Sequence, residues 1–304
     1  MSNGRTGAVV ALLLNALFWG LSWWPFRALH DVGVHPLWST ALSYALAWLG
    51  IVALYPQAPR ALLRHPVLFW LVLSAGLTNV GFNWAVTVGD VVRVVLLFYL
   101  MPVWAVLLAW PLLGERPARA AALRVLLGLA GVLLVLKTPE TPWPMPHSLA
   151  DYLALMGGFC FALTNVLLRK LHATPAPARM LAMFTGGGAL AFVTAILAHG
   201  ADLATAMPPL TPTLLAALAA LGLYFLVGNL GLQIGAARLP ANVTALIMLS
   251  EVVFASVSAA LLGAGHFTPA VATGGILILG AALLSVLSSG ASTTDQPTPE
   301  RSPA

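Results

Sequence analysis

Long apolar stretches that recur along almost the whole chain limit the fold more than any other feature. About ten of them, each roughly 18–25 residues long, fill residues 7–288 and are separated by short breaks that carry Pro, Gly, Arg or His. A hydrocarbon layer about 30 Å thick is crossed by about 20 helical residues, so each stretch is long enough to span it. With 60% hydrophobic and 8% charged residues, no soluble fold has enough interior to bury this surface. The sequence therefore predicts an all-α integral membrane protein.

Ten spanning helices of about 20 residues each use about 200 of the 304 residues and leave no room for a soluble domain. We expect a first five-helix unit at 1–138, a connecting loop at 139–147, a second five-helix unit at 148–288, and a disordered cytoplasmic tail at 289–304. The predicted spans are 7–29, 36–55, 66–88, 91–113, 119–137, 149–171, 178–199, 211–237, 240–262 and 268–288.

The positions of the basic residues predict the orientation. If the N-terminus is inside, 11 of the 14 Lys and Arg residues fall on the inner side and 3 on the outer side, which places both termini in the cytoplasm. The net charge of +5 comes from basic residues at the ends of apolar runs, without the basic patch that nucleic-acid binding requires. Cys160 is the one cysteine, so an internal disulfide is excluded.

The two halves of the chain repeat each other. A shift of 142 residues sets Ser22 of the first span on Thr164 of the sixth, and a shift of 146 sets Asn83 of the third span on Asn229 of the eighth. Because five is an odd number, the second unit enters the membrane upside down relative to the first. Inverted repeats with a site near the midplane are typical of secondary transporters.

One apolar run resembles a known family. Residues 101–116, MPVWAVLLAWPLLGER, resemble the end of the fourth helix in EamA-type members of the drug/metabolite transporter superfamily. Residues 249–252 together with 261–263 look like the counterpart in the second repeat, although Pro102 is replaced there by Glu251. The resemblance implies a ten-helix permease of the bacterial inner membrane, usually an exporter of amino acids or other small metabolites.

Glu251 is the acidic residue that falls in the middle of a predicted span. A carboxylate near the bilayer centre costs about 2.5–3.5 kcal/mol on insertion scales, so it should face protein or a water-filled cavity. It either binds a substrate ammonium group or carries a proton, or it is a protonated side chain that braces two helices. Both interpretations stay open at this stage.

Polar and aromatic residues recur on matching spans of the two halves. Asn15, Trp19, Ser22 and Trp23 share one face of the first span at helical spacing. Such a mixture suits the wall of a cavity for a small amphipathic solute, although intramembrane Asn, Ser and Thr also join helices, at about 0.6 kcal/mol per contact. The predicted substrate-binding set is Glu251, Asn15, Trp19, Ser22, Trp23, Asn79, Asn83, Tyr99, Thr164, Asn165, Tyr224, Asn229 and Met248.

Pro102 kinks the fourth span or acts as its hinge. The chain has no Walker-type phosphate loop and no intramembrane His cluster, so we expect no metal, no cofactor and no enzymatic activity. The sequence favours alternating-access export of an amino acid or similar metabolite. A multidrug or amine efflux permease is the alternative, ahead of a membrane enzyme or channel. The expected partners are a small-molecule substrate, the lipid bilayer and, through the fifth and tenth spans, a second copy of the chain.

Overall fold

The computed structural model describes residues 2–114, 119–136, 145–171, 173–236, 247, 250–266 and 268–291. Helices are the regular elements of this part of the chain, and no strand occurs within these ranges. Seven helical segments in it are long and apolar enough to cross a membrane. Three shorter apolar helices cover Val125–Val135, Ser250–Leu261 and Pro269–Ala281. The prediction of an all-α, multi-pass membrane protein is therefore confirmed.

The described helices follow the predicted spans closely, with one short helix added between the second and third. Residues 240–246 and 248–249 of the predicted ninth span lie outside the described residues. Their bounds are α1 Ser2–Leu21, α2 Trp23–Asp31, α3 Pro36–Leu54, α4 Ala58–Arg64, α5 Leu68–Val88, α6 Val91–Phe98, α7 Met101–Leu113, α8 Arg119–Leu136, α9 Leu149–Lys170, α10 Ala176–Gly200, α11 Pro212–Ala236, α13 Ser250–Leu261 and α14 Pro269–Ala291. The predicted tail and most of the predicted connecting loop lie outside the described residues.

Two predicted spans are divided into two helices each. The first span breaks at Ser22, whose amide and hydroxyl both donate to the carbonyl oxygen of Trp19, at 3.1 Å and 2.7 Å. Pro25 has no N–H to offer the carbonyl of Leu21, the last residue of α1, which explains the break. The fourth span breaks at residues 99–100 for the same reason, because Pro102 cannot donate to the carbonyl of Phe98.

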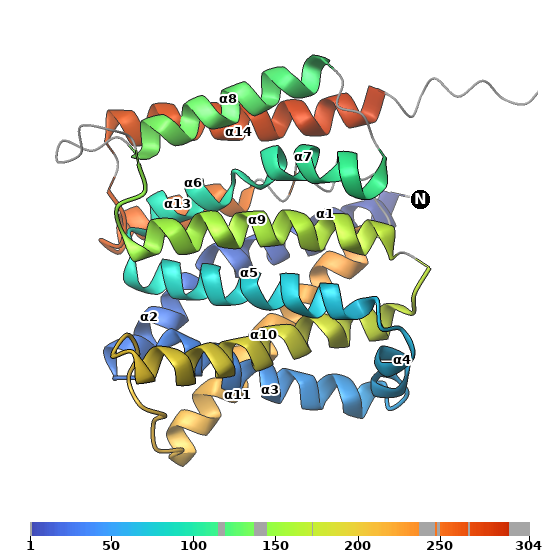
Figure 1. Cartoon of the computed structure of the whole chain (residues 1–304), viewed down its shortest axis with the longest axis vertical. Helices are drawn as coiled ribbons and strands as arrows, with labels where there is room; N and C mark the ends of the chain where they lie inside the picture. The colour runs from blue at the N-terminus through green and yellow to red at the C-terminus, as the bar shows by residue number, and fades with distance from the viewer. Residues whose placement is uncertain are drawn as a thin grey trace, which may run out of the picture.

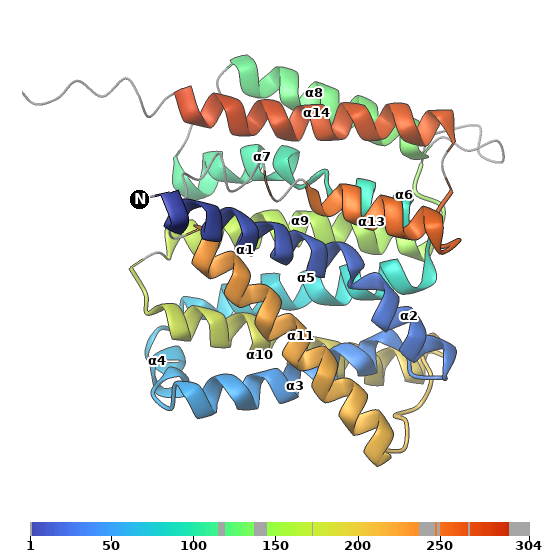
Figure 2. The same ribbon diagram turned by 180° about the vertical axis from the view of Figure 1, so that it is seen from behind.

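The long helices lie side by side in two layers. One layer, nearer the viewer in Figure 1, holds α7, α9, α5 and α10; the other, nearer the viewer in Figure 2, holds α13, α1, α11 and α3. Neighbours within each layer pack on one another, and α3 with α10 and α6 with α13 join the layers. The helices α8 and α14 pack together along one edge of the molecule. Each layer therefore contains helices from both halves of the chain.

Candidate functional site

The break between α1 and α2 lies directly against α13. A Cβ atom on Gly20 would stand 2.8 Å from the carbonyl oxygen of Glu251 and 3.1 Å from the amide nitrogen of Ala255, so only glycine allows this approach. Beyond the break, the indole Nε1 of Trp23 donates to the Ser258 hydroxyl at 3.0 Å. Both α1 and α2 are thus in contact with α13, and the first turn of α13 faces the break between them.

The break between α6 and α7 supplies the second partner of α13. Tyr99 ends α6 and is 3% exposed. Its side chain lies beside the carboxyl group of Glu251, which is partly buried in the first turn of α13. A carboxyl group beside a phenol and next to two broken helices can bind a cation or exchange a proton.

Aromatic side chains continue from this point between α1 and α11. Trp19 lies 5.3 Å from Phe225 between ring centroids, and Phe18 lies 4.5 Å from Tyr224. The Tyr224 hydroxyl also donates to the carbonyl oxygen of Phe18. Five residues of the predicted binding set therefore lie at α13 and the two breaks: Trp19, Ser22, Trp23, Tyr99 and Glu251. Tyr224 is a sixth, and it is connected to this group through its contact with α1.

A separate polar group lies between α3 and α5. The Tyr44 hydroxyl donates to the side-chain oxygen of Asn79, and the Asn83 amide donates to the Thr40 hydroxyl at 3.1 Å. These contacts join helices, as the alternative interpretation of the polar residues predicted. The ring of Tyr44 lies 5.2 Å from that of Phe225, so this group touches the aromatic cluster beside Trp19.

The other predicted residues occupy different surroundings. Thr164 is buried and donates to the Ser74 hydroxyl at 2.9 Å, whereas its neighbour Asn165 is exposed. Asn15 is fully buried on α1, and Asn229 is partly buried on α11. Met248 lies outside the described residues, and Pro102 is the second residue of α7.

Two cavities open between the helices, and neither is lined by a residue of the predicted binding set. One of about 260 Å³ lies between α3 and α11, lined by Leu46, Ala47, Ala219, Gly222, Leu223 and Leu226. The other, of about 340 Å³, lies where α5 gives way to α6 and where α9 begins, and its wall includes Asp90, Arg93 and His147.

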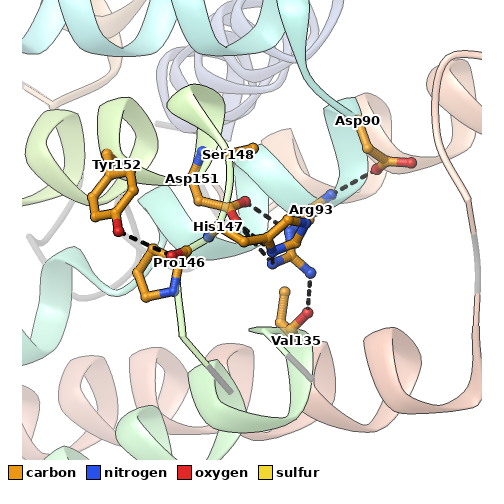
Figure 3. A network of polar contacts seen from close by, with 8 residues as sticks. All are labelled: Asp90, Arg93, Val135, Pro146, His147, Ser148, Asp151 and Tyr152. Atoms are coloured by element: carbon orange, nitrogen blue, oxygen red, sulfur yellow. Dashed lines mark hydrogen bonds and ion pairs between the residues drawn. The ribbon is translucent and has the colours of Figure 1, made fainter. Parts of the chain in front are cut away.

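An ion-pair network borders the larger cavity (Figure 3). Arg93 meets Asp151 through two bonds, Nε to Oδ1 at 2.7 Å and Nη2 to Oδ2 at 2.9 Å, and Asp151 also accepts from the backbone N–H of His147 at 3.2 Å. This network could not be predicted from the sequence, because its two charges are 58 residues apart and lie at helix ends. One sequence signal could have placed Asp151 in the first turn of a helix. Ser148 followed three residues later by Asp151 has the spacing of a helix N-cap, and the Asp151 amide donates to the Ser148 hydroxyl at 3.1 Å.

Comparison with protein families finds a match in the first half of the chain. Residues 6–137 match the EamA-like transporter family. The matched region runs from α1 to the end of α8, and it confirms the resemblance to EamA-type transporters that the sequence predicted. EamA-like proteins are transporters, so the match favours transport over catalysis.

The overall fold is shared with solved structures. One crystal structure of a protein aligns with 96% of this chain and 100% of its own, at 22% sequence identity and a TM-score of 0.56. At this identity the likeness concerns the fold alone. No curated protein gives a significant match.

Proposed function

We propose that this protein is a secondary transporter that exports a small metabolite by alternating access. The observation that carries the proposal is the Glu251–Tyr99 contact beside two broken helices, in a chain whose first half matches a transporter family. Discontinuous helices next to an intramembrane carboxyl group are typical of the binding sites of such transporters.

Ten spanning helices in two inverted five-helix repeats are part of this proposal. The seven long apolar segments and the three shorter apolar helices together support the number ten. Figures 1 and 2 support the inversion, because the two layers match when one repeat is exchanged for the other. The pair α5–α9 then corresponds to α11–α1, α5–α10 to α11–α3, and α7–α9 to α13–α1.

A pair of glycine contacts supports the repeat at the level of single residues. A Cβ atom on Gly76 of α5 would stand 2.5 Å from the carbonyl oxygen of Gly186 on α10, and one on Gly222 of α11 would stand 2.7 Å from that of Ser43 on α3. A shift of 146 residues sets Gly76 on Gly222, and a shift of 143 sets Ser43 on Gly186. The same close crossing thus occurs in both halves at matching positions.

The residues around Glu251 favour a zwitterionic or cationic solute with an apolar part, such as an amino acid. The Glu251 carboxylate would bind the ammonium group, while Trp19, Trp23 and Tyr99 would contact the apolar part, with about 1 kcal/mol from cation–π contact. Arg27 on α2 is turned away to the carbonyl oxygens of Val86 and Gly89 at the end of α5, so its cation already has partners. Asn15 on α1 and Asn229 on α11 are assigned the polar groups of the solute, because Asn79 and Asn83 already join α3 and α5.

A hinge at Pro102 also belongs to the proposal, and the break at residues 99–100 supports it, since a helix without a hydrogen bond at that point bends at low cost. We further propose the bacterial inner membrane as the location, with both termini in the cytoplasm, as the distribution of Lys and Arg favours. A homodimer through α8 and α14 also belongs to the proposal. It is supported by outward-facing leucines on α8, such as Leu126, which is 64% exposed.

The test is thermal stabilisation of the purified protein by amino acids, amines, aromatic drugs and phosphorylated sugars. A ligand at 100 times its dissociation constant adds about 2.7 kcal/mol to the free energy of unfolding. We expect amino acids or amines to raise the melting temperature of the wild type and of Asp202→Asn, an exposed carboxylate-to-amide control, but not of Glu251→Gln.

Other outcomes separate the alternatives. Stabilisation by amines and aromatic drugs alone would favour the multidrug or amine efflux permease. Stabilisation confined to phosphorylated sugars, or an equal effect in Glu251→Gln, would contradict the proposed role of this carboxylate.

A further inference from the structure

Arg93 connects three helices at one end of the bundle (Figure 3). Arg93 lies on α6 and forms the two-bond ion pair with Asp151 in the first turn of α9. Its Nη1 donates to the carbonyl oxygen of Val135 near the end of α8. The Arg93 side chain is 13% exposed and that of Asp151 is 1% exposed. Such a pair is strong in this geometry, and removing one partner leaves a buried charge without compensation.

Asp90 extends the connection to a fourth segment. One oxygen of its side chain accepts the Arg93 amide at 2.9 Å, and the other accepts from the backbone amide of His266 at 2.6 Å and lies 2.9 Å from its Nδ1. The amide of Val91 also donates to the carbonyl oxygen of Ala264 at 3.0 Å. The start of α6 is thereby attached to the connection between α13 and α14 as well as to α8 and α9.

The network lies between the proposed site and the nearer end of the molecule. Arg93 precedes Tyr99 by six residues on α6, or about 9 Å along a helix. The connections from α5 to α6 and from α13 to α14 are at this end, which is opposite the N-terminus of α1 and the C-terminus of α14 (Figures 1 and 2). The cavity of about 340 Å³ gives the pair a space that water can enter when the two charges separate.

The inverted repeat does not duplicate the ion pair. The shift of 142 residues sets Asp151 on Val9, and the shift of 149 for the fourth span sets Arg93 on Asn242, a residue outside the described part of the chain. Val9 packs with Ile247 against Ala8 and Leu12. Valine and asparagine form no ion pair, so the repeat carries this ion pair at one end of the proposed transporter and not at the matching positions of the other end.

We propose that the Arg93–Asp151 ion pair is a latch that holds this end of the bundle closed and breaks when the end opens. The proposal rests on alternating access. The latch stabilises the state closed at this end, and the matching residues Val9 and Asn242 cannot form such a pair, so the ion pair favours closure of this end in the absence of substrate. Separation of α6 from α9 exposes the cavity wall and the path along α6 towards Tyr99.

The test is the labelling rate of a cysteine on the cavity wall. The reporter is Ala150→Cys, at a position that lines the cavity and is 5% exposed, in a Cys160→Ala background that is free of other cysteines. The probe is a membrane-impermeant maleimide, applied to the full chain in proteoliposomes. We expect Asp151→Asn and Arg93→Gln each to raise the labelling rate about tenfold, the factor that about 1.4 kcal/mol produces.

Asp151→Glu keeps the charge and serves as the rescue variant, with a labelling rate close to that of the reporter alone. Asp202→Asn removes an exposed charge elsewhere and should leave the rate unchanged. An unchanged rate in both Asp151→Asn and Arg93→Gln would show a static brace and overturn the latch. An equal rise in Asp151→Glu would also overturn it, because packing rather than charge would then be responsible. The measurement needs no substrate, so its failure is distinguishable from failure of the binding role of Glu251.

Discussion

Replacement of Gly158 by alanine tests how tightly α9 fits against the broken fourth span. A Cβ atom at this position would stand 2.5 Å from the carbonyl oxygen of Phe98 and 3.2 Å from its Cα atom. Ordinary contact begins near 3.4 Å, so the two backbones must separate by about 1 Å. Both atoms belong to the backbone of Phe98, so no flexible side chain can move aside. A shift of Phe98 would also displace its neighbour Tyr99.

The expected cost of Gly158→Ala is about 1–3 kcal/mol, the usual range for overpacking. At about 2 °C per kcal/mol, the melting temperature should fall by about 2–6 °C. The assay is fluorescence-monitored thermal unfolding in detergent. Gly280→Ala is the matched control, since a Cβ atom there meets nothing within 4 Å, and its melting temperature should not fall. If the two variants melt at the same temperature, the close approach of α9 to Phe98 is refuted.

Two further predictions concern other parts of the molecule. Trp23→Phe removes the donor to Ser258, and a double-mutant cycle with Ser258→Ala in thermal unfolding should give a coupling of about 0.6 kcal/mol, the average for such bonds in membranes; a coupling of zero would contradict the contact. His35, which precedes α3, has its pKa lowered to about 4 by burial and by nearby His30. As the pH falls, the unfolded chain, with a pKa of 6.5, takes up this proton first. The free energy of unfolding should therefore fall by about 1.4 kcal/mol per pH unit between about pH 6.5 and 4. His35→Asn, which keeps a helix-capping side chain, should remove this contribution, and an unchanged pH profile in that variant would be inconsistent with it.

The sequence was sufficient for the helices and their order. In lipid a long apolar stretch must be helical, so the helical, multi-pass character of the chain could be predicted from the lengths of these stretches. The two breaks were less accessible, because Pro25 and Pro102 are tolerated inside many spanning helices. Whether such a proline kinks or interrupts a helix depends on its neighbours, here the close contact of α13 with Gly20 and the position of Glu251 beside Tyr99.

The candidate site was predictable only in part. Glu251 was found from its charge alone, since a carboxyl group is costly in the bilayer. Its partner Tyr99 was in the predicted set, but helical periodicity contains no information about contacts between distant spans. Thr164 and Asn165 show another limit, because adjacent residues on a helix point about 100° apart and the structure buries one and exposes the other. The Arg93–Asp151 pair was missed for the same reason as the Tyr99 contact.

The most direct test of the central claim is counterflow in proteoliposomes. Vesicles containing the protein are loaded with an unlabelled mixture of amino acids, and the same mixture in labelled form is added outside. We predict transient accumulation of label inside vesicles with the wild-type protein, and loss of this accumulation in vesicles with folded, membrane-inserted Glu251→Gln. Accumulation no greater than in protein-free vesicles would contradict amino-acid transport, and undiminished accumulation in Glu251→Gln would contradict the role assigned to the carboxylate.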